Sequence, residues 1–180
     1  MEIKDFLYQA ISEYGEKRIL SDIAQGESPV TINAIFDHCT PDLEKVGKNN
    51  PEIVGSLAEG LTHYMLTVAL IPSQRKTVLE SVDIDIAVPD VKTLSSSPEN
   101  VIIISFPKTR EINKIKELIS KLKKIQPKTE NIWLVVDEPV SVEAKVYTLD
   151  RNEFTFANMI NDLINFSSNA KQSKLKIFRI

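Results

Sequence analysis

The segment Val82–Val88 constrains the fold more than any other part of this chain. It reads Val-Asp-Ile-Asp-Ile-Ala-Val, so apolar residues alternate with Asp83 and Asp85. A period of two places alternate residues on opposite faces of an extended strand. The apolar face is expected to hold Val82, Ile84 and Ile86. Upstream of Pro72 the apolar residues recur every three or four positions, which is typical of helices. The chain is therefore expected to change from helices to a sheet near Pro72.

The same pattern gives the expected order of elements. Helices are predicted over 2–25, with a break near Gly15, and over 31–38, 51–70, 110–125 and 154–166. Strands are predicted over 76–81, 82–88, 101–106, 132–136, 143–149 and 175–180. A hairpin followed by a helical crossover predicts the α/β class, with a mixed central sheet and flanking helices.

Length and composition favour one compact domain. The chain has 180 residues, of which 42% are hydrophobic and 26% charged, and only 5 are glycine, so no flexible linker is visible. The apolar runs 68–71 and 101–104 are far shorter than the roughly 20 residues that cross a bilayer, which predicts no membrane association. The acidic N-terminal sequence and the single Cys39 favour a cytoplasmic location. With a net charge of −3, any nucleic-acid site must be a local basic patch.

Two charged residues have the spacing of a metal-dependent phosphodiesterase site. Such chemistry needs two or three carboxylates on a hard cation and a lysine near the attacking water or the scissile phosphate. Asp85 lies on the second strand of the predicted hairpin, and Lys108 follows the next strand. Because neighbouring strands lie about 5 Å apart, both groups are expected to reach one Mg²⁺ or Mn²⁺ ion.

With these residues the chain resembles the PD-(D/E)XK nuclease superfamily, which includes restriction endonucleases and Holliday-junction resolvases. Its members carry a helix with a glutamate, a hairpin ending like Glu-Ile-Asp-hydrophobic-hydrophobic-Ala, a strand ending in Glu-x-Lys-Thr, and a crossover helix. The counterparts here are Glu59, Val82-Asp-Ile-Asp-Ile-Ala87, Ile104-Ser-Phe-Pro-Lys-Thr109, and the helix from Arg110; the segment 149–157 resembles the closing strand–turn–helix.

The resemblance spans 51–166 and implies a restriction-endonuclease-like core of order α-β-β-β-α-β. Residues 1–50 are then a helical extension, and residues 167–180 a C-terminal strand or tail, in a single domain 1–180. It implies Asp85 and Lys108 as catalytic residues. It implies Glu59 and Asp85 as metal ligands, and Asp83 and Glu80 are the further candidate ligands.

One position departs from the family pattern. Phe106 stands two residues before Lys108, where the family has its second metal-binding acid, and a phenyl ring cannot bind a cation. Either Glu80 or Glu111 replaces that acid, or the domain no longer cleaves and serves as a nucleic-acid-binding or assembly module.

The predicted helix from Arg110 is strongly basic. Between 110 and 124 there are six Lys or Arg and two Glu, a net charge of +4. The residues expected to contact nucleic acid, DNA or RNA, are Lys108, Arg110, Lys114 and Lys121. The alternative is an ordinary solvated helix face. Nuclease folds that cut both strands commonly pair, so a homodimer is a further expectation.

The acidic strand 82–88 also has other interpretations. Asp83 and Asp85 also fit the solvated face of an ordinary strand. The segment 81–88 resembles the Ser-Asp-Ile-Asp pattern of nucleotidyltransferases, in which two Asp bind metal. That chemistry also needs a Gly-Ser turn roughly a dozen residues upstream, and Gly55-Ser56 lies farther away, inside a predicted helix. The segment 36–39, Phe-Asp-His-Cys, has no second His/Cys pair at metal-ligand spacing.

Overall fold

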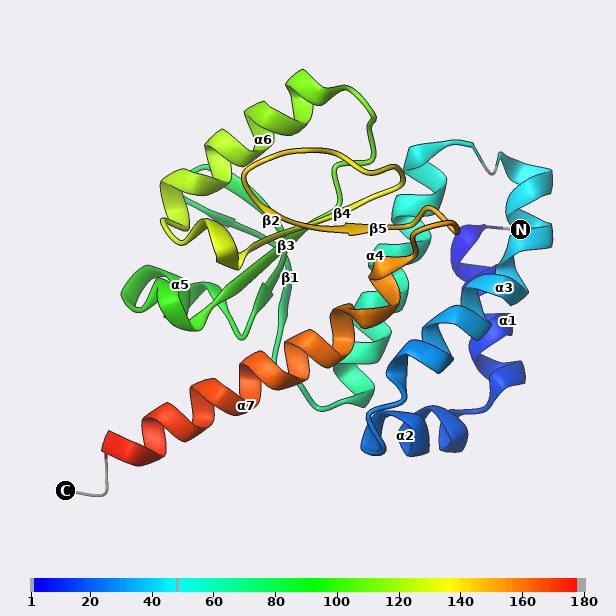
Figure 1. The fold of residues 1–180 in the computed structure, drawn as a ribbon, viewed down its shortest axis with the longest axis horizontal. Helices are drawn as coiled ribbons and strands as arrows, with labels where there is room; N and C mark the ends of the chain where they lie inside the picture. The colour runs from blue at the N-terminus through cyan, green and yellow to red at the C-terminus, as the bar shows by residue number, and fades with distance from the viewer. Residues whose placement is uncertain (1, 48, 178–180) are drawn as a thin grey trace.

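The computed structural model describes residues 2–47 and 49–177, and it changes from helices to a sheet near Pro72 as the sequence predicts (Figure 1). The first four helices are α1 (Ile3–Tyr14), α2 (Glu16–Ala24), α3 (Ser28–Val46) and α4 (Pro51–Val68). The later helices are α5 (Val91–Ser96), α6 (Ile112–Ile125) and α7 (Met159–Ile177), with 3₁₀ turns η1 (Pro98–Asn100), η2 (Thr129–Asn131) and η3 (Thr155–Asn158). Helices α1 to α3 gather at one end of the molecule, and α7 extends toward the other (Figure 1).

The strands form one mixed sheet, as predicted. They are β1 (Gln74–Leu79), β2 (Val82–Val88), β3 (Ile102–Ser105), β4 (Ile132–Val136) and β5 (Lys145–Thr148), paired in the order β1-β2-β3-β4-β5. The pairs β1–β2 and β2–β3 are antiparallel, whereas β3–β4 and β4–β5 are parallel. The hairpin accounts for the antiparallel pair β1–β2, β3 returns antiparallel to β2 after α5 and η1, and α6 supplies the crossover from β3 to β4.

Several sequence expectations need correction. The helix predicted over 31–38 runs the full 19 residues of α3 and includes Pro41, and the short helix α5 was not predicted. The strand predicted over 175–180 is wrong as far as the structure describes it, because α7 continues to Ile177; residues 178–180 lie outside the described chain. The predicted break at Gly15 is confirmed, since Gly15 has φ of 95° between α1 and α2.

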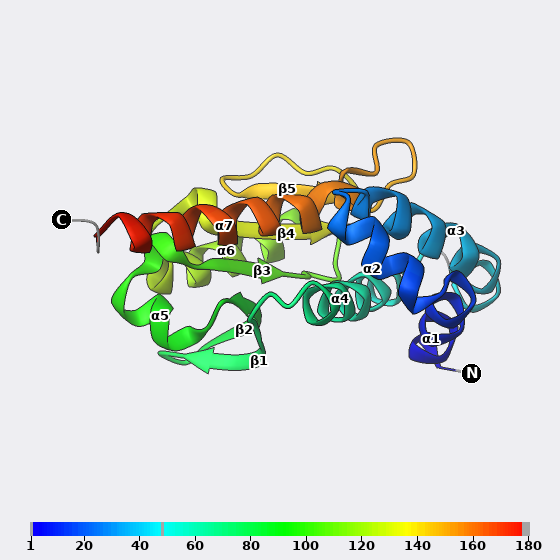
Figure 2. The same ribbon diagram turned by 90° about the horizontal axis from the view of Figure 1, so that it is seen from below.

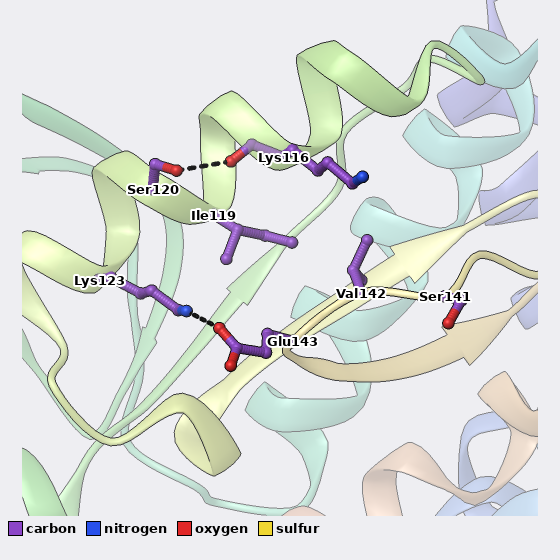
Figure 3. A pocket seen from close by; sticks show the side chains of 7 residues that line it. All are labelled: Lys116, Ile119, Ser120, Lys123, Ser141, Val142 and Glu143. Atoms are coloured by element: carbon purple, nitrogen blue, oxygen red, sulfur yellow. Dashed lines mark hydrogen bonds and ion pairs between the residues drawn. The ribbon is translucent and has the colours of Figure 1, made fainter.

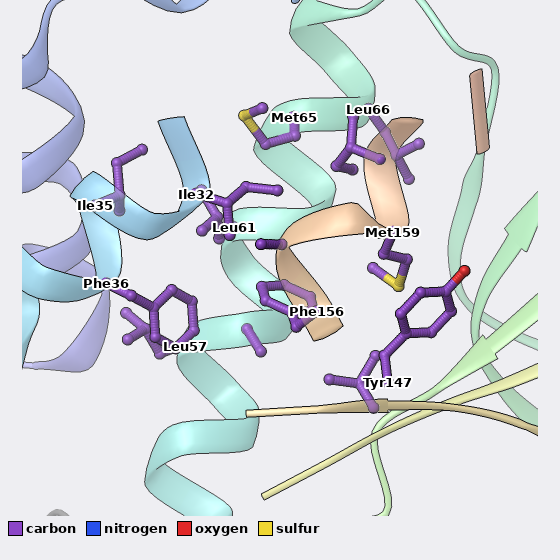
Figure 4. Packing of buried hydrophobic residues seen from close by; sticks show 14 of the residues in the cluster. Ile32, Ile35, Phe36, Leu57, Leu61, Met65, Leu66, Tyr147, Phe156 and Met159 are labelled. Carbon is purple, nitrogen blue, oxygen red and sulfur yellow. The ribbon is translucent and has the colours of Figure 1, made fainter. Parts of the chain in front are cut away.

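Helices cover both faces of the sheet, and each face has its own core. Helices α4 and α7 lie on one face, with α1 and α3 packed against α4, and Leu61, Met65, Phe156 and Tyr147 meet there in a large cluster (Figure 4). Helix α6 packs on the opposite face with Ile103 and Leu134. In Figure 2 the sheet lies between these layers. Among the described residues no helix has the length and apolar character needed to cross a membrane.

The alternation of β2 breaks at its centre. Val82 and Ile84 pack on the α6 side, but Ile86 packs on the α4 side, so the prediction that all three share a face is wrong. Lys76 lies opposite Asp85 at this break and has φ of 49°, and the strand pairing skips both residues. The register is the same on both sides of the break, so neither strand has an extra residue there.

A groove lies on the α6 side of the molecule. It runs between α6 and the segment that precedes β5, and it has a volume of about 520 Å³ (Figure 3). Its lining residues are Lys116, Ile119, Ser120, Lys123, Ser141, Val142 and Glu143.

Candidate functional site

Glu59 is the centre of the candidate site. It lies on α4, which begins after Asn50, whose side chain accepts a hydrogen bond from the backbone N–H of Glu52, and has Pro51 in its first turn. These signals fix where the helix starts and hence which face it turns to the sheet. The Glu59 side chain is 2% exposed. A carboxylate that deeply buried needs partners of opposite charge.

Three cations surround the Glu59 carboxylate. Lys76 and Arg75 of β1 contact Oε1 at 2.7 and 3.3 Å, and Lys108, which follows β3, contacts Oε2 at 2.8 Å. The cations are much less buried than the carboxylate: the exposed fractions of Lys76, Arg75 and Lys108 are 54%, 40% and 27%. The buried acid therefore holds a group of cations that still face solvent.

Asp85 joins the same group through Lys76. The ammonium of Lys76 lies 3.1 Å from Asp85 Oδ1 and 2.7 Å from Glu59 Oε1, so one cation bridges two carboxylates. Asp85 Oδ2 accepts hydrogen bonds from the Ser105 hydroxyl at 3.2 Å and the Phe106 backbone N–H at 2.9 Å. We call Glu59, Arg75, Lys76, Asp85 and Lys108 the Glu59 cluster. Its formal charge is +1.

The backbone at Lys108 is also specialised. Lys108 has φ of 54° and follows Pro107, so the chain turns sharply after β3. Its stem lies against Gly55 of α4, where a Cβ would be only 3.0 Å from Lys108 Cγ. Gly55 and Glu59 are one helical turn apart on one face. The absence of a side chain at Gly55 therefore allows Lys108 to lie along α4 and reach Glu59.

Charge compensation shows in the pKa values of the cluster. Burial alone would raise the pKa of Glu59, but the hydrogen bonds and charges of Lys108 and Lys76 outweigh it, and this pKa lies below its ordinary value. Burial alone would lower the pKa of Lys76, but hydrogen bonds to Glu59 and Asp85 outweigh it and raise this pKa. Both groups are therefore charged near neutral pH.

The cluster does not fit a divalent cation as it stands. All four carboxylate oxygens of Glu59 and Asp85 already accept bonds from N–H or O–H groups. Mg²⁺ and Mn²⁺ need such oxygens as ligands. Within residues 2–47 and 49–177, no three His, Cys, Asp or Glu side chains are arranged so as to hold a metal ion. The ammonium of Lys76 lies where two carboxylates would share a cation.

The other predicted acids lie apart from the cluster. Asp83 is exposed and pairs with Val78 nearer the hairpin turn, and Glu80 is exposed in that turn. Glu111 precedes α6 and pairs with Lys114 at 2.6 Å. None of their contacts that the structure describes reaches Glu59 or Asp85. Phe106 is 4% exposed and packs in the core on the α4 side, so its side chain belongs to the packing of the fold.

The predicted basic residues divide into two groups. Lys108 belongs to the Glu59 cluster, and Arg110 pairs with Asp137 at 2.7 Å and with Glu138 at 3.2 Å. Lys114 and Lys121 lie exposed on α6, which covers the sheet face opposite to α4. The basic helix therefore does not pack over the Glu59 cluster.

Sequence reasoning missed Lys76 and Arg75 as site residues. A usable signal existed: a tight hairpin that pairs Leu79 with Val82 places Lys76 opposite Asp85, and opposite charges directly across a strand pair attract. Gly55 carried no comparable signal, because its role depends on the path of a segment about fifty residues later in the chain.

The sequence matches no protein-family model and no curated protein. The fold does match solved structures. One is metal-depleted Ecl18kI in complex with uncleaved, modified DNA, with a TM-score of 0.56 and 13% identity over 94% of this chain and 80% of that chain. Another is metal-depleted Ecl18kI in complex with uncleaved DNA, with a TM-score of 0.49 and 16% identity over 93% of this chain and 62% of that chain.

The first of these likenesses establishes the fold. Ecl18kI is a PD-(D/E)XK restriction endonuclease, and this chain has a restriction-endonuclease-like fold, as the sequence resemblance predicts. At 13% identity the likeness concerns the fold alone. Whether Asp85 and Lys108 are catalytic, and whether Asp83, Glu59 and Glu80 bind metal, stay predictions.

Proposed function

We propose that this protein binds DNA, and that the Glu59 cluster contacts a backbone phosphate through its lysines and without a divalent cation. The restriction-endonuclease-like fold supports DNA as the partner, because the matched Ecl18kI structure is a complex with DNA. The cluster supports a phosphate contact, since its net charge is +1 and its cations are partly exposed.

The observation that carries this proposal is the position of Lys76. Its ammonium bridges Glu59 and Asp85 at 2.7 and 3.1 Å, so the charge that a metal ion would supply comes from the chain itself. A lysine is a compact point charge that binds phosphate well. With its acids neutralised, the cluster attracts an anion, whereas an unpaired carboxylate pair would repel one.

Fluorescence anisotropy of a short labelled duplex tests the proposal. Binding is expected in EDTA and is expected to weaken as salt rises, and Mg²⁺ is expected to give no gain in affinity, because a divalent counterion on the duplex competes with the lysines. Lys76→Gln is expected to lower the salt slope by about one. Lys45→Gln is the matched control, because Lys45 is also ion-paired but lies on α3. No binding at low salt, or binding only with metal present, overturns the proposal.

A second candidate is metal-dependent phosphodiester cleavage, with Asp85 and Lys108 as the catalytic pair. The specific observation in its favour is that Glu59, Asp85 and Lys108 lie in one cluster on the elements that the family resemblance names. It requires Mg²⁺ or Mn²⁺ to displace the Lys76 ammonium. Cleavage of plasmid DNA in Mn²⁺, abolished by Asp85→Ala, would establish it; intact DNA with both proteins would exclude it.

A further inference from the structure

The outward face of α6 carries lysines that the fold does not use. Lys116, Lys121 and Lys124 are exposed, and among the described residues none of them has an ion pair or side-chain hydrogen bond. Their helix packs on the sheet through Ile115, Ile119 and Leu122, so its position does not depend on these charges. The charges are therefore available to a partner.

The groove beside α6 is a concave surface next to these lysines. Lys116 and Lys123 mark its two ends on the helix side, and the segment before β5 forms the other wall (Figure 3). Ile119 and Val142 supply apolar surface between them, and the Lys116 side chain extends over Val142 (Figure 3). Lys123 is paired with Glu143 across the groove, which holds that end in place.

The spacing of the lysines suits a polyanion. Lys116 and Lys123 are seven residues apart, which is about 10 Å along a helix axis. Successive phosphates of one DNA strand advance about 3.4 Å along the duplex axis, so the groove spans roughly three phosphates. The exposed Ser141 hydroxyl in the opposite wall can donate a hydrogen bond to a phosphate oxygen.

Like charges that are close together on a helix surface repel each other, and Glu117, one turn before Lys121, offsets part of this repulsion. Lys121 and Lys124 are three residues apart and are neighbours on the helix surface, whereas Lys116 is five residues before Lys121 and lies on a different side of the helix. Residues 110–124 have a net charge of +4 in a chain whose net charge is −3. An anionic partner on this face would remove the repulsion, so the charge distribution favours a polyanionic occupant.

We propose that the groove between α6 and the segment before β5, together with the adjacent outward face of α6, is a second DNA-binding surface, which takes backbone phosphates through Lys116 in the groove and through Lys121 and Lys124 on the helix face beside it. It lies on the sheet face opposite to α4 and is distinct from the Glu59 cluster. The proposal rests on DNA binding by this protein, as proposed above. It adds a contact that reads no bases, because lysines on phosphates position a duplex without specifying its sequence.

The test compares two charge-matched double variants of the full chain by anisotropy with a short labelled duplex. Lys116→Ala with Lys121→Ala removes one charge from the groove and one from the outward face of α6 beside it. Lys17→Ala with Lys92→Ala removes the same charge from exposed lysines on α2 and α5, which have no described ion pair. The groove variant is expected to lower the salt slope by about two and to weaken binding by tens of fold at 0.1 M salt, on the order of the counterion term for two phosphates.

The outcomes separate this inference from the proposed function. Wild-type protein that binds no DNA refutes both. If the wild type binds and the groove variant behaves like the Lys17 and Lys92 control, the groove inference is wrong and DNA binding stands. Polyglutamate of equal charge is a competitor that tests for an acidic protein instead: if it binds the wild type as tightly as DNA does and is lost in the groove variant, the occupant is not DNA. Circular dichroism of each variant confirms that it is folded.

Discussion

Lysines occur in two regions of this molecule, and their surroundings differ. In the Glu59 cluster, Lys76 and Lys108 contact a carboxylate that is 2% exposed, and Lys76 also contacts Asp85. On the outward face of α6, Lys116 and Lys121 are exposed, and the described structure gives them no carboxylate partner. In the first region the cations stabilise buried charge. In the second they are left for a partner.

The difference shows why a basic sequence segment is a weak guide to a site. The +4 charge of residues 110–124 is visible in the sequence, yet it lies on the sheet face opposite to α4. Arg75 and Lys76 belong to no basic segment of the sequence, yet they complete the cluster because they lie across a hairpin from the strand that carries Asp85. Burial of the acid decides which lysines have a structural role.

Phe106→Glu gives the largest expected effect and tests whether the cluster has room for a third acid. It places a charge in a core position that is 4% exposed, so the free energy of unfolding is expected to fall by about 4 kcal/mol or more. Urea denaturation measures the loss. Ile112→Glu, at a position 40% exposed in the first turn of α6, is the control and should change stability by less than about 1 kcal/mol. A stable Phe106→Glu protein that binds Mn²⁺ would show that the Glu59 cluster can hold a metal ion, so its lysines would not be needed to neutralise its acids.

Glu59→Gln is expected to destabilise the protein by roughly 2 kcal/mol, because it leaves Lys76, Lys108 and Arg75 without their shared charge. The figure is below the usual cost of breaking a buried ion pair, since the cations are partly exposed and water screens them. The same change should strengthen DNA binding, as the cluster becomes more positive. Glu117→Gln on the exposed side of α6 should alter stability by less than about 0.5 kcal/mol. Equal losses for the two variants would contradict a special role for the buried acid.

The pH dependence of stability should differ between wild type and Glu59→Gln. The folded pKa of Glu59 is lowered, so its stabilisation is present above its ordinary pKa of 4.5 and is lost as pH falls through the folded value. The raised pKa of Lys76 acts at the other limit: its contribution is present below 10.5 and is lost as pH rises through the folded value. Urea denaturation between about pH 3 and pH 6 should show the two proteins converging at the acid end. A difference in unfolding free energy that stays constant across that range would mean that the neighbouring cations do not lower the pKa of Glu59 in the folded state.

Gly55→Ala gives the smallest expected effect and tests the packing of Lys108. The new Cβ would lie 3.0 Å from Lys108 Cγ, so the lysine stem must shift and its ammonium moves away from Glu59. The expected loss is about 0.5 kcal/mol of DNA-binding free energy, roughly a factor of two to three. Gly60→Ala is the matched control on the same helix, where a Cβ would meet Leu7 at 3.0 Å and not the cluster. Equal DNA affinities of the two variants would show that Lys108 does not contact DNA.

Local sequence pattern predicts much of the fold, because the spacing of apolar residues and the Pro, Gly and Asn residues at their ends determine single helices and strands. Helix α4 and strand β4 follow directly from their apolar spacing and flanking residues. Helix α3 was underestimated because Pro41 suggested an end, although the helix continues through it. The strand predicted at 175–180 failed because a short alternating tail does not show whether the preceding helix continues.

The candidate site was predictable only in part. Glu59, Asp85 and Lys108 lie together because helix, hairpin and strand end meet at one edge, which the family resemblance anticipates. Asp83 and Glu80 do not join them, since they lie nearer the hairpin turn. Lys76, which bridges Glu59 and Asp85, has a left-handed backbone, and apolar periodicity carries no information about that conformation.

The most direct test of the account is calorimetric titration of Mn²⁺ into wild-type protein and into Lys76→Met. The Lys76 ammonium already lies between Glu59 and Asp85, where a metal ion would lie. Wild type should therefore show no saturable binding at millimolar Mn²⁺, whereas Lys76→Met should bind one ion and lose it again when Asp85→Ala is added. Saturable binding of one Mn²⁺ ion to the wild type, abolished by Asp85→Ala alone, would contradict it.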